Sequence, residues 1–282
     1  MARDDAGEGR WSRGEEKLPA DASNPRFSPS LTRGLGLLRC FTADRPVLGI
    51  ADLANSSDLS RSTIYRYVVT LVELGYLEPL GDRRYRLGLR VSDLGLCAVS
   101  GTGLRAPARE SLRWLQECTG LAVGLAVLDG PQVVYVEWLG GWRNVPGAGL
   151  RWCPGTGTRL AAHRTAVGMV LLAHLPEQER VGIARQIVFR RRGRTAGGSR
   201  ASLLAELPSI AEKDYAISDK DGSPGVSEVA VPVRDGPAVV AALGLSCSSG
   251  SCGADLLERH GRILDQGARR ISTALGAVTS KV

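Results

Sequence analysis

Basic and hydroxyl side chains gather in the first two turns of a segment that ends at Leu74. These side chains belong to Ser60, Arg61, Ser62, Thr63, Tyr65 and Arg66. A helical wheel gathers the apolar residues of the segment on another face, so the polar ones would face outward. Arginine can form two hydrogen bonds to a guanine edge, and serine or threonine can contact bases or phosphates. The segment therefore predicts a helix that reads double-stranded DNA, with Arg66 directed to a base and Arg61 to a phosphate.

The residues on either side predict the elements that would hold this helix. Apolar spacing predicts one helix over about 30–42 and a shorter one over about 49–55. The third helix is bounded by Ser60, a natural N-cap, and by Gly75, a natural C-terminal stop. Packing of its apolar face on the first two helices would leave its polar start at the surface.

A two-stranded hairpin with a basic turn is predicted after the third helix, over 76–87. Three helices and a hairpin in this order predict a winged helix-turn-helix domain. We expect Arg83 and Arg84 at the tip of the hairpin, and Arg33 near the start of the first helix, to contact DNA phosphates. Such contacts fix the position of a protein on DNA without reading its sequence.

Four segments are predicted along the chain: a disordered tail at 1–28, the winged domain at 29–89, a linker helix at 90–106 and a second domain at 107–278. The second domain combines antiparallel strand pairs with flanking helices, which predicts an α+β fold. The helices expected there cover about 107–118, 163–175, 201–213 and 254–275. Val91, Leu94 and Leu96 give the linker helix an apolar surface for contact between two copies.

The composition of the 282-residue chain excludes several classes of protein. A hydrophobic content of 43% is enough for buried cores, and a net charge of +7 favours polyanionic partners. No stretch approaches the ~20 apolar residues of a membrane span, so we expect no membrane partner and a cytoplasmic, nucleoid-associated protein. The six cysteines lack zinc-type spacing, and neither a metal nor a cofactor is expected.

The segment from Ser30 to Gly88 resembles the winged helix-turn-helix of the IclR family of bacterial transcription regulators. The resemblance rests on SLTRGLGLL, IADLANSSDLSRSTIYRYVVTLVELGYLE and RRYRLGLRVSDLG, which have the spacing of the family. The chain departs from the family pattern at Asp58, where glycine is usual, but aspartate tolerates the left-handed backbone of a turn. The resemblance implies DNA binding by the third helix.

The remainder of the chain is similar to the GAF-like effector-binding domain of the same family. Residues 155–168, 214–235 and 239–246 carry this similarity. In the family these segments surround a pocket for a small molecule, commonly an organic acid or an aromatic metabolite. The resemblance places six residues at this pocket: Ala166, Val167, Asp219, Glu228, Gly244 and Ser246. The backbone N–H groups of Ala166 and Val167, at the start of a helix, would be donors to an anionic ligand.

The second domain also departs from the family pattern. The departures are Arg164, Met169, Glu228 and Gly244. A carboxylate at position 228 would repel a carboxylate ligand unless it were protonated or paired, so the effector is expected to be neutral, cationic or larger than a short organic acid. Trp138, Trp142 and Trp152 are candidates either for the wall of an aromatic-accepting site or for core and interface packing.

Two further features are read as structural. His163 is expected to form a structural hydrogen bond at a helix start, because neither of the other two histidines stands at metal-ligand spacing with a cysteine or a carboxylate. The basic run at 189–194 is expected to form a solvated loop rather than a DNA contact, because it lies far along the chain from the reading helix.

The sequence as a whole predicts a regulator that binds a palindromic operator as a homodimer or a homotetramer and responds to a small-molecule effector. Two alternatives stay open. One is a redox-responsive regulator acting through Cys153, Cys247 or Cys252. The other is an enzyme with an accessory helix-turn-helix, which would require a nucleophile beside a base, a metal set or a phosphate loop. The sequence offers none of these arrangements.

Overall fold

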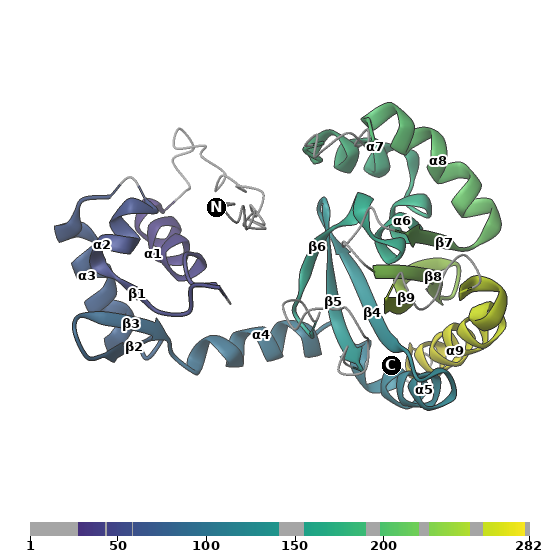
Figure 1. The fold of residues 1–282 in the computed structure, drawn as a ribbon, viewed down its shortest axis with the longest axis horizontal. Coiled ribbons are helices and arrows are strands. Elements are labelled where there is room, and N and C mark those ends of the chain that lie inside the picture. The colour runs from purple at the N-terminus through teal and green to yellow at the C-terminus, as the bar shows by residue number, and fades with distance from the viewer. Residues whose placement is uncertain are drawn as a thin grey trace, which may run out of the picture. The chain divides into compact units, whose positions relative to one another are not determined.

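The computed structural model describes residues 28–42, 44–57, 59–140, 155–189, 198–219, 226–248 and 256–279. Contacts divide the chain into a first unit, 1–97, and a second unit, 98–282 (Figure 1). Helix α4 (Arg90–Ser100) crosses this division. The tail expected at 1–28 lies outside the described residues, apart from Ser28, whose side chain caps the first helix.

The first unit has the predicted order of three helices and a hairpin. Its elements are α1 (Pro29–Arg39), β1 (Leu48–Gly49), α2 (Ile50–Asn55), α3 (Arg61–Glu73), β2 (Leu77–Leu80) and β3 (Arg84–Leu87). Leu37 of α1, Leu53 of α2 and Ile64 and Val68 of α3 are buried together, which confirms the face of α3 predicted to pack on the other helices. The burial of these apolar side chains, rather than helix propensity, holds three short helices in place.

The sheet of the first unit has one strand more than predicted, because β1 pairs with β3 in the order β1-β3-β2. The two residues of β1 are too few to show the alternation by which a strand is recognised in a sequence. Helix α1 also ends three residues earlier than the predicted position 42. The chain beyond it turns at Thr42, whose backbone forms a bridge with Arg45.

The C-terminal end of α3 is fixed to the start of α4. Gly75 has a positive φ of 75° and follows the C-cap of α3, as the sequence predicts. The N–H of Tyr76 donates to the carbonyl of Leu71 at 2.8 Å, which closes the last turn. The guanidinium of Arg90, the first residue of α4, donates to the carbonyl of Leu74 at 3.0 Å. A Cβ atom on Gly88 would lie 2.2 Å from the carbonyl oxygen of Gly75, so the two backbone segments meet without a side chain between them.

The second unit is built on a six-stranded antiparallel sheet in the order β6-β5-β4-β9-β8-β7. Its strands are β4 (Ala122–Asp129), β5 (Gln132–Leu139), β6 (Arg159–Ala161), β7 (Ala216–Asp219), β8 (Val226–Asp235) and β9 (Ala238–Ser248). Its helical elements are α5 (Arg105–Thr119), η2 (Ala162–Arg164), α6 (Ala166–Ala173), α7 (Glu177–Gln186), α8 (Arg200–Lys213) and α9 (Leu256–Thr279). The α+β class predicted from the sequence is confirmed.

The two faces of this sheet bury side chains of different size. Helices α5 and α9 lie on one face, where branched residues such as Leu125, Leu243 and Leu245 fill the core. Helices α6 and α8 lie on the other face (Figure 1), where Ala126 and Ala242 are part of the core. Small side chains on this face allow α6 to lie close to the sheet.

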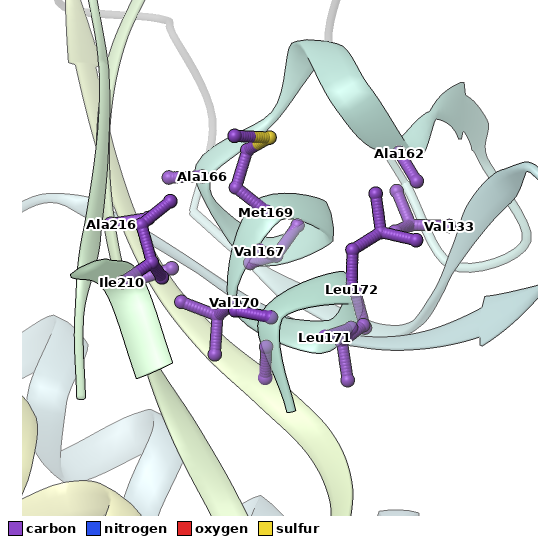
Figure 2. Packing of buried hydrophobic residues seen from close by; sticks show 14 of the residues in the cluster. Val133, Ala162, Ala166, Val167, Met169, Val170, Leu171, Leu172, Ile210 and Ala216 are labelled. Carbon is purple, nitrogen blue, oxygen red and sulfur yellow. The ribbon is translucent and has the colours of Figure 1, made fainter. Parts of the chain in front are cut away.

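Helix α6 is buried along its whole length. All eight of its residues are buried, which is the pattern of a helix covered on every side. Figure 2 shows Val170 directed toward Ile210 and Ala216, and Leu172 toward Val133. The first residue and the orientation of α6 are therefore fixed by packing.

The helix predicted over 163–175 is divided in the structure. Residues 162–164 form η2, and Thr165 is extended and caps α6. Helix α7 and the edge strands β6 and β7 were not predicted, since the edge strands are short and α7 lacks a clear apolar stripe. No helix among the described residues is long and apolar enough to cross a membrane.

Candidate nucleic-acid interface and effector site

The start of α3 is exposed and carries a network of hydroxyl groups. The Oγ of Ser60 accepts from the backbone N–H of Thr63 at 3.2 Å, which caps the helix. The same Oγ lies 3.0 Å from the Oγ of Ser62 and 2.9 Å from the Oγ1 of Thr63. Because these hydroxyls are exposed, they are available to a ligand as donors or acceptors.

The cationic side chains of this surface stand open to solvent. Arg61 and Arg66 on α3 and Arg33 on α1 are all exposed, and Tyr65 is 57% exposed. Within the described parts of the chain, no carboxylate forms an ion pair with Arg61 or Arg66. Burial of Ile64 on the opposite face fixes the backbone from which these two guanidinium groups extend.

The three arginines of the hairpin differ in their partners. Arg83 lies in the turn with a φ of 56° and is exposed. Arg84 is exposed too, and its Nη2 donates to the carbonyl of Val47 at 3.3 Å. Arg86 forms two 2.9 Å hydrogen bonds with Glu78 on the neighbouring strand, and this pairing lowers the pKa of the Glu78 carboxyl. Arg83 is therefore the hairpin arginine that is most open to a phosphate.

The start of α6 is also capped by a hydroxyl, but it is buried and filled. The Oγ1 of Thr165 accepts from the N–H of Gly168 at 3.1 Å. The N–H groups of Ala166 and Val167 donate to Oε2 of Glu228 at 2.7 Å and 3.4 Å. Glu228 reaches this position from β8, 62 residues further along the chain than Ala166. The two backbone donors predicted for an anionic ligand are thus engaged by a carboxylate of the chain itself.

The second oxygen of Glu228 accepts two further hydrogen bonds. The hydroxyl of Tyr135 donates to Oε1 at 2.9 Å, and the Oγ of Ser246 donates to it at 3.5 Å. We call these two hydroxyls and the N–H groups of Ala166 and Val167 the α6 seat. Burial raises the pKa of the Glu228 carboxyl, while the four donors of the seat oppose that rise. Burial and the nearby Glu228 raise the pKa of the Tyr135 phenol well above its ordinary value.

Two glycines permit the close packing around the seat. A Cβ atom on Gly244 would lie 2.9 Å from Cγ1 of Val167 and 3.0 Å from Oε1 of Glu228. A Cβ atom on Gly168 would lie 2.1 Å from the carbonyl oxygen of Ala162. Gly244 is one of the departures from the family pattern, and here its missing side chain leaves room for the Glu228 carboxylate.

The structure brings together five of the six residues expected at the effector pocket. Ala166, Val167, Glu228, Gly244 and Ser246 meet at the α6 seat. Asp219 ends β7 opposite Ser227, one register position from Glu228. Sequence reasoning missed Tyr135 and Thr165. Tyr135 alternates with valines in a buried strand, and a hydrogen bond across 93 residues leaves no local signal.

The aromatic and histidine predictions have mixed outcomes. The half-buried Trp138 makes an edge contact with Tyr135 and donates to the carbonyl of Gly140, which favours core packing. Trp142 and Trp152 lie outside the described residues, as do Asp58 and all of the basic run beyond Phe189. The expected hydrogen bond of His163 is not found at its buried Nδ1, which has no partner in the part of the chain that the structure describes. Burial there lowers the pKa of His163 to about 4.

The remaining ionisable groups of the described residues include one connected set of side chains. No group of three potential metal ligands is found in the described ranges. His174, which the sequence left without a partner, lies 2.8 Å from Oδ1 of Asp214, and the same oxygen accepts from Arg234 at 2.7 Å. Cys247 is buried in the core, whereas Cys153 and Cys252 lie outside the described residues.

Comparison with known proteins identifies both units. The family described as "IclR helix-turn-helix domain" matches residues 30–81, and "Bacterial transcriptional regulator IclR C-terminal" matches residues 96–273. The transcriptional regulator KdgR of Dickeya chrysanthemi is 30% identical over 89% of this chain and 81% of its own length. The regulator XynR of Escherichia coli is 31% identical over 88% of this chain and 97% of its own length.

A solved structure adds a ligand to this comparison. An IclR homologue from Microbacterium hydrocarbonoxydans, complexed with 4-hydroxybenzoate, superposes with a TM-score of 0.74. It is 26% identical, and the match covers 88% of this chain and 99% of that one. The matched families and relatives are transcriptional regulators and not enzymes.

Proposed function

The chain belongs to the IclR family of bacterial transcriptional regulators, and from this premise we propose that it binds a palindromic DNA operator as a dimer or a dimer of dimers under the control of a small metabolite. The observation that carries the proposal is the start of α3, where Arg61 and Arg66 are exposed and unpaired among the described residues. A rigid helix that presents unpaired guanidinium groups is suited to the major groove.

The DNA contacts divide into two kinds. Arg66 stands one turn into α3 and reads a base, together with Ser62 and Tyr65. Arg61 at the first turn, Arg33 on α1 and the hairpin arginines Arg83 and Arg84 hold phosphates. Ser60 and Thr63 cap the helix and add hydroxyl groups to the same surface.

Exposed leucines on two helices support assembly into dimers. Leu31 and Leu35 of α1 are 63% and 51% exposed, and Leu94 and Leu96 of α4 are 58% and 55% exposed. Apolar side chains of this size are expected to be covered in the functional assembly. A twofold dimer would present two α3 helices to the two halves of a palindrome.

The effector site lies at the face of the second-unit sheet that carries α6. Ala166, Val167, Glu228, Gly244 and Ser246 mark this region, with Asp219 at the end of the neighbouring strand, and Glu228 already occupies the α6 seat within it. The 4-hydroxybenzoate bound to the Microbacterium homologue supports a small molecule as the effector. The effector shifts operator affinity by the difference between its affinities for the DNA-bound and the DNA-free protein.

Fluorescence anisotropy on a labelled fragment of the chain's own promoter region tests the DNA contacts. Arg66→Ala is expected to weaken specific binding by about 5- to 150-fold and to relax the preference for one base pair. Arg61→Ala is expected to weaken binding to all sequences alike and to reduce the dependence on salt. Arg113→Ala, which removes an exposed arginine from α5, is the control. Unchanged operator binding by a folded Arg66→Ala protein would overturn the assignment of α3.

A further inference from the structure

The first turn of α6 has no donor left for a ligand. The N–H groups of Ala166 and Val167 donate to Glu228, and the N–H of Gly168 donates to the Oγ1 of Thr165. The N–H of Met169 begins the helical pattern by donating to the carbonyl of Thr165 at 3.0 Å. Every orphan N–H of this helix start is therefore satisfied within the chain.

The group that fills the seat has the chemistry of a bound anion. A helix start attracts negative charge, because its N–H groups and the helix dipole both point at the ligand. A carboxylate has about four lone-pair positions, and Glu228 receives four donors, two on each oxygen. This is the coordination that a free carboxylate would have in the same place.

The protein around the seat is shaped to hold this carboxylate. Glu228 stands opposite Ser246 in the β8–β9 register and opposite Ser218 in the β7–β8 register, so it extends from β8, the strand beside the edge strand β7, to the start of α6. The residue is only 5% exposed. On the β9 side Gly244 leaves the space that Oε1 of Glu228 occupies, since a Cβ atom there would lie 3.0 Å from this oxygen.

We propose that Glu228 is an internal ligand that fills the α6 seat and closes it to free carboxylates. The effector of this protein is accordingly a molecule that docks without a carboxylate in the seat, since a second anion beside Glu228 would find repulsion and no donor. This statement about the effector rests on the proposed function, whereas the occupation of the seat does not. Glu228 thereby determines the specificity of the domain.

Chemical rescue of a variant tests the proposal. Glu228→Ala removes a CH2–COO⁻ group and leaves a vacancy that matches acetate. We expect this variant to melt at a lower temperature than the wild type. Added sodium acetate should raise its melting temperature in proportion to ln(1 + c/Kd), where c is the acetate concentration, by about 3–6 °C at ten times the dissociation constant. Sodium chloride at equal ionic strength controls for a general salt effect.

Three proteins serve as matched references in the same titration. These are the wild type, Glu228→Gln and Ser246→Ala. Glu228→Gln keeps the length of the side chain, and Ser246→Ala keeps the carboxylate. None of the three should show an acetate-specific shift of the melting temperature. An acetate-specific shift in the wild type, or none in a folded Glu228→Ala protein, would overturn the proposal.

Two further measurements keep the proposal testable if Glu228→Ala does not fold: a titration of another variant, and amide hydrogen exchange of the wild type. In that case Glu228→Ser, whose hydroxyl can still accept hydrogen bonds, replaces it in the acetate titration. In the wild type the N–H groups of Ala166 and Val167 should be protected without any ligand, and neither acetate nor benzoate should change their exchange. Increased protection by either carboxylate would contradict an occupied seat.

Operator binding is measured separately by anisotropy on the wild type. Loss of the proposed DNA-binding function would appear there, while failure of the internal ligand would appear in the acetate titrations and in hydrogen exchange. A protein that binds its operator and takes up acetate without substitution of Glu228 keeps the proposed function and loses this inference.

Discussion

Helices α3 and α6 begin with the same local motif and put it to opposite uses. In each, a hydroxyl at the N-cap accepts from the N–H three residues later, Ser60 from Thr63 and Thr165 from Gly168. The first turn of α3 is exposed, and Arg61 and Arg66 form no ion pair with any carboxylate of the described residues. The first turn of α6 is buried and bonded to Glu228. The same cap begins both helices. Burial of the first turn determines whether its N–H groups are open to another molecule or bonded to a side chain of the same chain.

The difference arises from what packs against each helix. Only one face of α3 is buried, by Ile64, Val68 and Leu71, so its other face stays open. All of α6 is enclosed between the sheet and α8, and burial of unsatisfied N–H groups there would be costly. An internal carboxylate removes this cost, whereas water does so at α3.

The largest effect is expected where the close packing of α6 is disturbed. Gly168→Ala would set a Cβ atom 2.1 Å from the carbonyl oxygen of Ala162 and should destabilise the second unit by about 3 kcal/mol or more. Gly34→Ala is the matched control. Gly34 lies on α1, and its added Cβ atom would make an ordinary contact, 3.8 Å from the ring of Tyr67 on α3. This substitution should be neutral or stabilising by less than about 1 kcal/mol. Urea unfolding of both variants measures the contrast, and equal losses would contradict it.

The next largest effect is expected when a carboxylate is placed at the start of α3, as Glu228 is at the start of α6. Ser62→Glu puts a carboxylate at the exposed start of α3, which favours the helix but repels DNA phosphates. Operator affinity should fall by more than about tenfold while the melting temperature stays the same or rises. Ser62→Gln, which has the same size and no charge, is the control. Equal losses from both substitutions would show that the hydroxyl, and not the open charge of the surface, is what matters.

Removal of the two caps should give a smaller difference. Ser60→Ala exposes the N–H of Thr63 to water and is expected to cost about 1 kcal/mol. Thr165→Ala leaves the buried N–H of Gly168 without a partner and is expected to cost about 2 kcal/mol. Thermal and urea unfolding give the two losses. A greater loss at Ser60 would reverse the proposed ranking of the two helix starts.

The smallest effect is expected on the pH dependence of stability, through protonation of His163 just before α6. Burial, with a contribution from Arg164, holds the pKa of His163 at about 4, against an ordinary value of 6.5. The unfolded chain therefore takes up a proton first as the pH falls, and the folded state should lose stability between about pH 6.5 and 4. Solvent screening limits this loss, because the ring is partly exposed.

His163→Gln should lack this part of the pH dependence. The difference in free energy of unfolding between the wild type and the variant should favour the wild type most at pH 7 and should become smaller toward pH 4. Urea unfolding at a series of pH values measures the two curves. Parallel curves would contradict the pKa assignment.

The sequence was informative wherever function or packing left a local pattern. The amphipathic spacing of Ile64, Val68 and Leu71 predicted which face of α3 is buried, and Ser60 and Gly75 predicted its ends. Short edge strands such as β1 and β7 lack such a pattern, because their pairing depends on neighbours distant in the chain.

The residues of the α6 seat were predictable only in part, since Ala166, Val167 and Ser246 were expected there and Tyr135 was not. Resemblance to a family brought Ala166, Val167 and Glu228 to one region, but treated the two amides as donors to a ligand and the carboxylate as a source of repulsion. That both amides donate to Glu228 depends on the position of this residue in β8, which only the pairing of the strands reveals. Tyr135, which completes the arrangement from β5, comes from a different hairpin.

The contact between Gly75 and Gly88 has a mechanical consequence. The two backbone segments meet directly there, and Arg90 forms a hydrogen bond to Leu74 at the end of α3, so the start of α4 is held against the end of α3 at two points. Helices α3 and α4 are therefore expected to move together. A change in the direction of α4 should move α3 as well, and Gly88→Ala, whose Cβ atom would lie 2.2 Å from the carbonyl oxygen of Gly75, should weaken this coupling.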